Sequence, residues 1–505
     1  MKSDVQNTAR LNQVFAGAFA IVSILTMAGA FADAPGDSLH LLARTRVEIA
    51  PKSGKFEVVE KGVDIDPKRT ALIICDLWDK HWCDGATARV GVMAPRIDAT
   101  AKALRARGSL IVHAPSDTMA FYQDTPQRRR AQEAPPAQTP IAFHWNACDP
   151  SVEPPLPIDD TDGGCDTTNK MYIAWKREHP AVEVAPQDAV SDQGREIYNL
   201  FVQHGIRNVL FCGVHANMCV LGRSFGIRAM HMLGLNPILL RDLTDAMYDP
   251  HSFPYVPHER GADLVVEHIE KFWCPSVLSG DILGDPKKLN IAVAIAEDEY
   301  HANETLPAFI KDEFERDSRF NFVILQSDSK TDFPGLETLK TADLLVMFMR
   351  RRSLPEDQLK AFRFYFDTGK PLIGIRTACH AFQNWPDFDG AVFGGHYNMH
   401  YPARGTMTVR ALHSAAGNPL LRGVAPSWTT SSSLYKMLPL NEGCAPVLDG
   451  TWEDKPAEPV AWTTKQHGGR VFFTSLGSPD DFRNADFRRL LKNAVLWASD
   501  HAIEK

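Results

Sequence analysis

Between Thr70 and Pro275 the sequence alternates short apolar runs with amphipathic stretches, and this alternation limits the fold more than any other feature. Five runs predict strands: ALIICDLW, SLIVHAP, MYIAWK, NVLFCGV and PILLRDLTDA. Helical periodicity marks the stretches PRIDATAKALRARG, SDQGREIYNLFVQHG and MCVLGRSFGIRAMHMLG. The alternation predicts an α/β fold, with a mostly parallel sheet and helices on both of its faces.

A second alternation of the same kind follows a polar, turn-rich segment at residues 278–288. It includes the predicted strands LNIAVAIAED, FNFVILQ, ADLLVMFM, PLIGIRT and RVFFTSLG, and no sequence repeat relates the two halves. A chain of 505 residues is too long for one ordinary core. We therefore expect two three-layer α/β domains, at residues 70–277 and 289–505, with residues 278–288 as a linker and residues 33–69 as a lead-in.

The N-terminus has the pattern of a secretory signal at residues 1–32. Lys2 and Arg10 precede the uncharged stretch Val14–Ala32, and Ala30 and Ala32 supply the small residues of a cleavage site. The sequence thus predicts a secreted or periplasmic protein. The stretch is also just long enough to span a bilayer, so an uncleaved anchor is the alternative.

Charge and cysteine content set further limits. The net charge of −8 gives no electrostatic reason to expect nucleic-acid binding. The cysteine count is nine, which leaves at least one thiol unpaired. Cys148 and Cys165 bracket a Pro/Asp/Gly-rich irregular segment, where a disulfide would stabilise a loop with little core of its own. Two unpaired loop cysteines are the alternative.

Three reactive side chains fall at predicted strand ends of the first half. Asp76 ends the first strand, Lys176 ends the third, and Cys219 begins the helix after the fourth. The carboxyl ends of parallel strands form one ligand-binding edge. A helix N-terminus and a lysine lower a thiol pKa, and a carboxylate can accept the thiol proton. Singly, each residue also fits a structural role in packing, capping or a solvated charge cluster.

The Asp…Lys…GVxxxxCV arrangement resembles the isochorismatase-like cysteine hydrolases, a family that includes nicotinamidases and N-carbamoyl amidohydrolases. The resemblance implies that Asp76 is the general base, Lys176 the family lysine and Cys219 the nucleophile. It also implies a cis peptide between Val214 and His215. Backbone N–H groups at the start of the same helix, those of His215 and Met218, would bind the oxyanion.

The sequence also departs from that family. The nicotinamidase metal pattern is missing after the second strand, where His113 and Asp117 have the wrong spacing, so we predict no catalytic metal and no cofactor. A large insertion at residues 116–170 and the WDKHWC segment shape the pocket differently, which leaves the substrate open. Lys170 is a nearby rival for the role of Lys176.

The second half resembles the ThuA-like domains, named for trehalose utilisation, which share the class I glutamine-amidotransferase fold. The matching segments are AEDEYHANETLPAF, GKPLIGIRTACHAF, FGGHYNMHYP and GGRVFFTSLGSPDDF. Cys379 lacks the flanking glycines of a nucleophile elbow, so we do not expect it to be a nucleophile. His380, His396 and His400 are candidates for lining a sugar pocket or binding a metal, and ordinary core or loop histidines are the alternative.

Together these patterns predict an exported cysteine hydrolase that cleaves a C–N bond of a small amide-type molecule. A carbohydrate ligand of the second domain is a further expectation, and the oligomeric state stays open, a homo-oligomer included. Two alternatives remain. One is vinyl-ether hydrolysis of the isochorismatase type, in which the cysteine is not the nucleophile. The other is a surface glycan-binding protein whose second half is the functional module.

Overall fold

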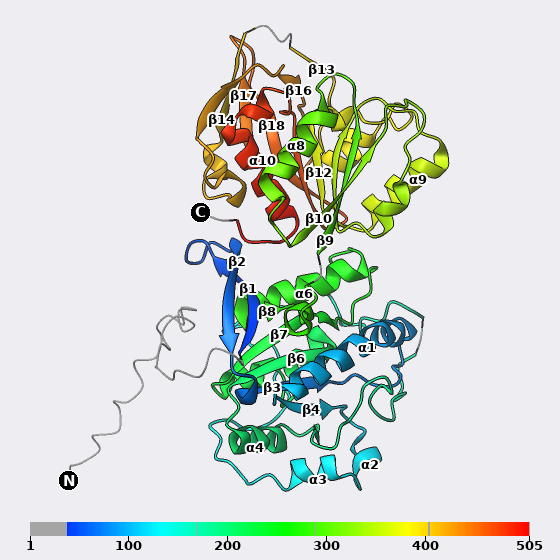
Figure 1. Ribbon diagram of the computed structural model, residues 1–505, viewed down its shortest axis with the longest axis vertical. Coiled ribbons are helices and arrows are strands. Elements are labelled where there is room, and N and C mark those ends of the chain that lie inside the picture. The colour runs from blue at the N-terminus through cyan, green and yellow to red at the C-terminus, as the bar shows by residue number, and fades with distance from the viewer. Residues whose placement is uncertain (1–37, 169, 287, 402–404, 504–505) are drawn as a thin grey trace, which may run out of the picture. The chain divides into compact units, whose positions relative to one another are not determined.

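The computed structural model describes residues 38–168, 170–286, 288–401 and 405–503. The predicted signal segment at residues 1–32 lies outside these ranges. Within them, no helix is long and apolar enough to cross a lipid bilayer. The described chain forms two large separate sheets flanked by helices, which confirms the predicted α/β class (Figure 1).

The first sheet has eight strands in the order β2-β1-β8-β7-β6-β3-β4-β5. The strands from β8 to β5 run parallel, whereas β1 pairs antiparallel with both β2 and β8. The described part of the predicted lead-in, from residue 38 on, therefore belongs to this sheet as a hairpin at its edge. The bounds are β1 (Leu39–Glu48), β2 (Phe56–Ile65), β3 (Thr70–Cys75), β4 (Leu110–Ala114), β5 (Ala189–Val190), β6 (Asn208–Val214), β7 (Asn236–Asp245) and β8 (Ser276–Val277).

Helices cover both faces of the first sheet. On one face α1 (Asp84–Ala106) and α7 (Ser279–Leu283) bury Val90, Ile97 and Ile282 against the strands. On the other face α4 (Gly194–His204) and α6 (His258–Phe272) bury a second apolar layer. The shorter helices are η1 (Pro67–Arg69), α2 (Met119–Tyr122), α3 (Pro126–Gln132), η2 (Ala216–Val220) and α5 (Ile227–Met232). The result is the expected three-layer arrangement.

Two segments differ from their predicted structure. MYIAWK is not a strand, because Met171, Tyr172 and Ile173 are exposed and no neighbouring strand pairs with them. The short β5 takes the edge position instead. Part of the predicted linker, the helix α7, packs onto the first sheet: the Asp281 carboxylate accepts the Leu42 backbone N–H at 2.9 Å.

The second sheet has nine strands in the order β10-β9-β11-β12-β19-β18-β17-β14-β15. The five strands from β10 to β19 are parallel, and the pairs from β19 to β15 are antiparallel. This sheet is mixed, not mostly parallel as predicted. Its strands are β9 (Leu289–Ala296), β10 (Phe320–Gln326), β11 (Leu344–Met349), β12 (Leu372–Ile375), β14 (Met407–Ala411), β15 (Ser427–Thr430), β17 (Ala445–Thr451), β18 (Glu458–Gln466) and β19 (Gly469–Thr474).

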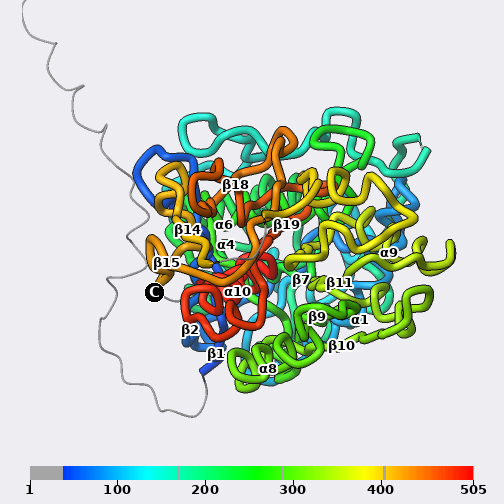
Figure 2. Tube along the Cα trace, turned by 90° about the horizontal axis from the view of Figure 1, so that it is seen from above, coloured from blue at the N-terminus to red at the C-terminus, as the bar shows by residue number. Residues whose placement is uncertain are grey.

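Helices also lie on both faces of the second sheet. Helices α8 (Ala302–Phe314) and α10 (Ala485–Ala498) lie side by side and share one core, and α9 (Glu356–Asp367) packs into the core of the opposite face (Figures 1 and 2). A separate two-stranded sheet joins β13 (Met399–His400) to β16 (Tyr435–Lys436). The short helices are η3 (Leu336–Lys340), η4 (Arg376–His380), η5 (Asp389–Phe393), η6 (His413–Ala415), η7 (Pro419–Leu421) and η8 (Asp481–Arg483).

Candidate active site

Asp76 is the residue that directly follows the buried strand β3. Its backbone has a φ of 45°, a left-handed conformation that is rare outside glycine, and its side chain is fully buried. One carboxylate oxygen accepts the Ser116 backbone N–H at 2.7 Å, and the other accepts Arg223 Nε at 3.0 Å. The Cys219 thiol lies close enough to this carboxylate for the two groups to shift each other's pKa. Backbone strain and convergent partners make Asp76 a candidate site residue.

Cys219 lies after β6, the strand next to β3, in the five-residue π-helical turn η2. The peptide bond between Val214 and His215 is cis, as the family resemblance implies. The expected long helix is interrupted, since residues 223–226 separate η2 from α5. Such a short turn has little macrodipole to act on a thiol.

Arg223 is the cation of this site. Its backbone N–H donates to the Cys219 carbonyl at 3.0 Å, which places the guanidinium one turn beyond the thiol. Its Nη2 also lies 3.7 Å from Asp117 Oδ2. The residue spacing of four in CVLGR, from Cys219 to Arg223, is the sequence signal that could have identified it.

Lys176 requires a correction. Its side chain is exposed and has no hydrogen-bond or ion-pair partner in the part of the chain that the structure describes. Only its backbone N–H is engaged, donating to Asp79 Oδ1 at 3.0 Å. The physical reason is the loop: because MYIAWK forms no strand, Lys176 does not project from a strand end. Lys170, the rival, is exposed as well.

The electrostatics of the thiol also differ from expectation. Burial raises the pKa of Cys219, and the adjacent Asp76 carboxylate raises it further, while Arg223 opposes both. Burial likewise raises the pKa of Asp76 against the effect of Arg223. The resting site is therefore a neutral thiol beside a carboxylate–guanidinium pair, not a preformed thiolate.

Of the two predicted oxyanion donors, Met218 is engaged elsewhere, because its backbone N–H donates to the His215 carbonyl at 3.0 Å. The role of His215 stays a prediction. The His215 side chain is 2% exposed, and burial together with neighbouring His81 lowers its pKa to about 3. Its Nε2 atom is buried without a hydrogen-bond partner.

A row of aromatic and imidazole rings extends from His215 to Trp78, close to Asp76. His81 meets His215 edge-on at 5.1 Å and stacks with Trp175 at 5.7 Å, and Trp175 stacks with Trp78 at 4.3 Å. Trp78 Nε1 donates to the Ser116 carbonyl at 2.9 Å. Trp175 Nε1 is, like His215 Nε2, buried and unpartnered, so both are available to a ligand. The sequence indicated only that WDKHWC shapes a pocket.

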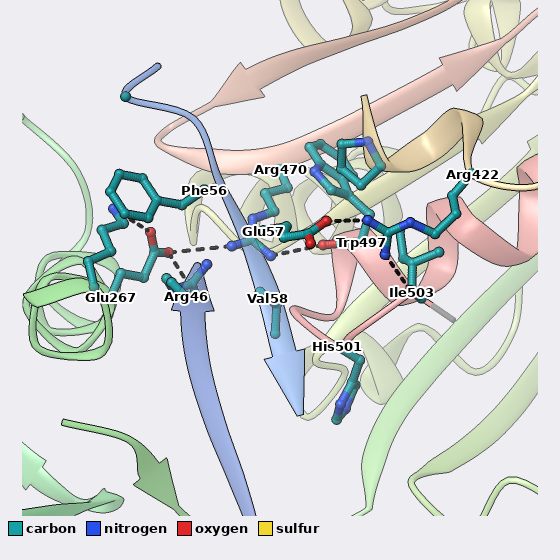
Figure 3. Close-up of a pocket in the computed structure, with 13 residues that line it drawn as sticks. Arg46, Phe56, Glu57, Val58, Glu267, Arg422, Arg470, Trp497, His501 and Ile503 are labelled. Carbon is teal, nitrogen blue, oxygen red and sulfur yellow. Dashed lines mark hydrogen bonds and ion pairs between the residues drawn. The ribbon is translucent and has the colours of Figure 1, made fainter. Parts of the chain in front are cut away.

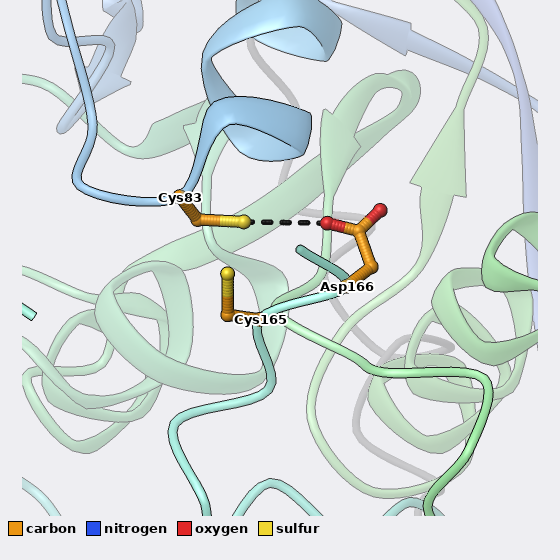
Figure 4. Close-up of side chains that lie close together, drawn as sticks. All are labelled: Cys83, Cys165 and Asp166. Carbon is orange, nitrogen blue, oxygen red and sulfur yellow. Dashed lines mark hydrogen bonds between the residues drawn. The ribbon is translucent and has the colours of Figure 1, made fainter. Parts of the chain in front are cut away.

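The cysteine positions contradict the predicted Cys148–Cys165 disulfide. Every cysteine is a free thiol, and Cys165 faces Cys83, not Cys148 (Figure 4). The ligand atoms of Cys83, Cys165 and Asp166 all lie within 4.8 Å of one another. Cys83 precedes α1, and the loop that carries Cys165 folds back onto that helix start. Sequence spacing could not reveal this pairing of distant segments.

These three side chains are also the set of described residues that could hold a metal ion. Arg89 already supplies a positive charge there, since its Nη1 lies 2.5 Å from Asp166 Oδ2. Its Nε binds Asp245 at 2.8 Å. A cation would have to displace or repel this guanidinium, so we assign no metal to the cluster.

In the second domain the three candidate histidines, His380, His396 and His400, do not form one group. His380 stacks on Tyr397 at 4.5 Å, and His400 Nδ1 lies 3.3 Å from the Tyr397 hydroxyl. His396 instead contacts Asn441 Oδ1 at 2.8 Å. His380 and His400 thus share one cluster, from which His396 is absent.

A pocket of about 240 Å³ lies elsewhere, and it includes neither Cys219 nor His380 (Figure 3). Three arginines line it, and each is paired with an acid: Arg46 with Glu270 at 2.9 Å and with Asp500, Arg422 with Glu57, and Arg470 with Asp500. Paired charges of this kind leave little binding capacity for a ligand, so we interpret the pocket as polar packing.

Comparison with known proteins supports part of this description. Residues 291–498 match the family model for trehalose utilisation (ThuA), so the C-terminal half of the chain carries a ThuA domain. No curated protein matches the chain in sequence. A ThuA-like protein from Bacteroides uniformis overlaps 42% of this chain and 91% of its own, at 18% identity and a TM-score of 0.35.

Two solved structures of other classes also overlap the chain. A cysteine hydrolase from Pseudomonas syringae pv. phaseolicola covers 44% of this chain and 93% of its own, at 15% identity and a TM-score of 0.28. An isochorismatase family protein from Burkholderia thailandensis covers 36% and 80%, at 17% identity and a TM-score of 0.21. Because these overlaps are partial and weak, we assign no function from them.

Proposed function

We propose that the first domain is a cysteine hydrolase that cleaves the C–N bond of a small amide, ureide or carbamoyl compound. One observation carries the proposal: the Cys219 thiol adjoins the Asp76 carboxylate, which pairs with the Arg223 guanidinium at 3.0 Å. The set lies at the carboxyl ends of two neighbouring parallel strands, where α/β sheets bind ligands.

In the first step Cys219 attacks the substrate carbonyl carbon while Asp76 takes the thiol proton. The S–C bond forms, and the carbonyl oxygen becomes an oxyanion that the backbone near His215 stabilises. Asp76 then hands its proton to the nitrogen, the C–N bond breaks, and ammonia or an amine leaves. A thioester on Cys219 remains.

In the second step water replaces the nitrogen leaving group. Asp76, again a carboxylate, accepts a proton from the attacking water. The thioester C–S bond then breaks and releases the acid, and Asp76 returns its proton to the leaving sulfur, which restores the Cys219 thiol and the carboxylate. Arg223 keeps the Asp76 carboxylate in place and favours the thiolate that develops during attack.

The surrounding side chains support a flat substrate. Trp78, His81 and Trp175 present parallel ring faces, with interplanar angles between 13° and 20°. Such faces suit a planar amide or ureide group. The unpartnered Trp175 Nε1 donates a hydrogen bond, and the neutral His215 imidazole can donate or accept one.

Ammonia release from a panel of amides, ureides and carbamoyl compounds tests the proposal, with wild type beside Cys219→Ala and Cys274→Ala. Cys274 is a buried core thiol of the same domain, so it controls for loss of a packed sulfur. We expect release by wild type and Cys274→Ala only. Activity retained in Cys219→Ala would overturn the proposal, as would a wild type that releases no ammonia from any compound of the panel.

We also propose that the protein is exported. Lys2 and Arg10, the uncharged stretch Val14–Ala32 and the small residues Ala30 and Ala32 support this proposal. The N-terminus of the mature protein, sequenced after expression in a secreting host, should then begin at Asp33. Recovery of the full chain from the cytoplasm would contradict it, and recovery from membranes would favour the anchor.

A further inference from the structure

The carboxyl edge of the second sheet carries two strained arginines. Arg376 directly follows β12 with a φ of 49°, and Arg351 follows β11 with a φ of 48°. These strands are parallel neighbours, so both residues lie at the same edge. Positive φ at a non-glycine residue costs free energy, and such strain persists where the surroundings enforce it, most often at functional sites.

Arg376 is a buried cation without a direct acidic partner. Its side chain is 1% exposed, and its donors reach only neutral acceptors: the Ser475 carbonyl at 2.8 Å, the Ser433 hydroxyl at 3.0 Å and the Ser432 hydroxyl at 3.3 Å. No carboxylate of a described residue lies within ion-pair distance. Asp481 is one step away, accepting the Ser432 hydroxyl at 2.6 Å. The Arg376 Nε atom is buried and unpartnered.

Tyrosine rings confine this guanidinium. Its central carbon lies 4.2 Å from the Tyr300 ring centroid and 4.9 Å from that of Tyr435. The Glu297 carboxylate fixes Tyr300 by accepting its backbone N–H at 2.8 Å. Because the two tyrosine rings pack against the guanidinium, a ligand can approach it only along its edge. A planar carboxylate matches a guanidinium edge.

More positive charge gathers around His380, which neighbours this group. Burial and the guanidinium groups of Arg351, Arg350 and Arg376 lower the pKa of His380 to about 3. Arg350 binds Glu299 at 2.5 Å, but Arg351 has no acidic partner among the described residues and is exposed. His380 is consequently neutral and offers a polar ring nitrogen beside excess positive charge.

The cluster also has hydroxyl groups and a solvent side. Arg376 and Tyr435 are buried, Tyr300, Tyr397 and His380 are partly exposed, and His400 is exposed. Tyr397 packs against Tyr435 at 4.7 Å. Neutral hydroxyls and ring nitrogens beside an unneutralised guanidinium suit a ligand that combines one negative charge with several hydroxyls.

We propose that this strand-end cluster of the ThuA domain binds a small hydroxylated carboxylate, such as a sugar acid, through Arg376 and Arg351. The carboxylate supplies the charge that Arg376 lacks, and Tyr300, Tyr397 and His380 bind the ligand hydroxyls. The proposal is independent of the chemistry at Cys219. It also distinguishes the cluster from the pocket in Figure 3, where acids already pair with the arginines.

Isothermal titration calorimetry of the full chain tests the proposal, with D-gluconate and D-glucuronate as probes and D-glucose and inorganic phosphate as comparisons. We expect the sugar acids to bind at least about tenfold more tightly than glucose. Arg376→Met should weaken that binding at least about tenfold, and Arg351→Ala by a smaller factor. Arg363→Ala, a control at a half-exposed arginine on α9, should leave it unchanged.

Each other outcome overturns the proposal. Equal binding of glucose and gluconate would show that the negative charge of the ligand does not contribute. Tighter binding of phosphate than of the sugar acids would show that the site does not select a carboxylate. The absence of detectable sugar-acid binding removes the site itself. If Arg376→Met fails to fold, Arg351→Ala decides, because its exposed side chain can be removed without opening the core. Unchanged gluconate binding in Arg351→Ala then contradicts the proposal.

Discussion

The carboxyl edges of the two sheets each carry a strained charged residue directly after a strand, but the two residues have opposite charge. In the first domain a carboxylate, Asp76, follows the central strand β3 with a φ of 45°; in the second a guanidinium, Arg376, follows β12 with a φ of 49°. Asp76 pairs with Arg223, whereas Arg376 has no acidic partner among the described residues. One edge holds a proton acceptor beside a thiol, and the other holds an uncompensated cation.

Each edge also has a buried thiol, and the partners of the two thiols differ. Cys219 adjoins the Asp76 carboxylate, while Cys379 Sγ lies 3.2 Å from His380 Nδ1 and 3.3 Å from the Arg376 carbonyl oxygen. An imidazole with a pKa of about 3 is a poor proton acceptor at neutral pH. Position at a strand end is therefore not enough for nucleophilic chemistry; the charge of the neighbouring group decides.

The largest effect should separate the two thiols. Cys219→Ala removes the nucleophile, so ammonia release should fall by at least about 10⁴-fold. Cys379→Ala should leave the rate unchanged, because the imidazole beside that thiol is a poor proton acceptor. Steady-state rates of both variants, with circular dichroism to verify folding, check the expectation. The opposite result would place the active site in the ThuA domain.

The next effect separates two cations of the first domain. Arg223→Met leaves Asp76 without its buried partner, and we expect kcat/KM to fall by about 10³-fold. Lys176→Met changes an exposed side chain and should alter kcat/KM by less than about twofold. Arg223→Lys should recover part of the activity. A larger loss in Lys176→Met than in Arg223→Met would restore the family lysine to the site.

A smaller effect concerns His113, a buried histidine among acids. Burial would lower its pKa, but Glu178 at 2.7 Å and Asp188 at 3.0 Å raise it to about 9. A folded-state pKa above the unfolded value of about 6.5 stabilises the fold fully below pH 6.5. That stabilisation, on the order of 3 kcal/mol, is lost as the pH rises through 9.

Denaturant unfolding of wild type and His113→Gln at pH 6 and pH 9.5 measures this contribution. The free-energy advantage of wild type over the variant should shrink between the two pH values. An advantage that is constant with pH would show that His113 is neutral in the folded protein.

His380, a partly exposed histidine among guanidinium groups, should behave in the opposite way. Its pKa of about 3 lies below the unfolded value, so the unfolded chain binds the proton more readily. Wild type should lose stability relative to His380→Gln as the pH falls from 6.5 toward 3. The effect should be smaller than at His113, because the His380 ring is partly exposed. Unfolding midpoints at pH 7 and pH 4 provide the test, and parallel curves would contradict it.

The smallest effect distinguishes thiol pairs. Under a diamide oxidant, Cys83 and Cys165 should each give up a proton and together two electrons, forming one disulfide and lowering the mass by about 2 Da. Peptide mapping should find this link and no link between Cys148 and Cys165. A Cys148–Cys165 peptide would restore the pairing that the loop sequence predicted.

Most elements could be predicted from the sequence because they depend on local periodicity. The apolar runs at β3, β4, β6 and β7 and the helical pattern of α4 specify buried strands and an amphipathic helix without reference to the rest of the chain. The strand prediction for MYIAWK was wrong because its apolar residues are exposed in the insertion. The antiparallel strands β14 (MTVRA) and β17 (APVLDGT) were missed, since neither contains a long continuous apolar run.

The sequence by itself determined the two α/β halves and located Asp76 and Cys219, because a residue that follows a buried strand must lie at the edge of the sheet. Only the tertiary structure decided that Arg223 is their cation, that Cys165 faces Cys83, and that Arg376 has no acid beside it. Those outcomes depend on how long insertions fold back onto the sheets. Their physical reason is that Coulomb interactions and hydrogen bonds act between atoms close in space, whereas sequence patterns record only neighbours along the chain.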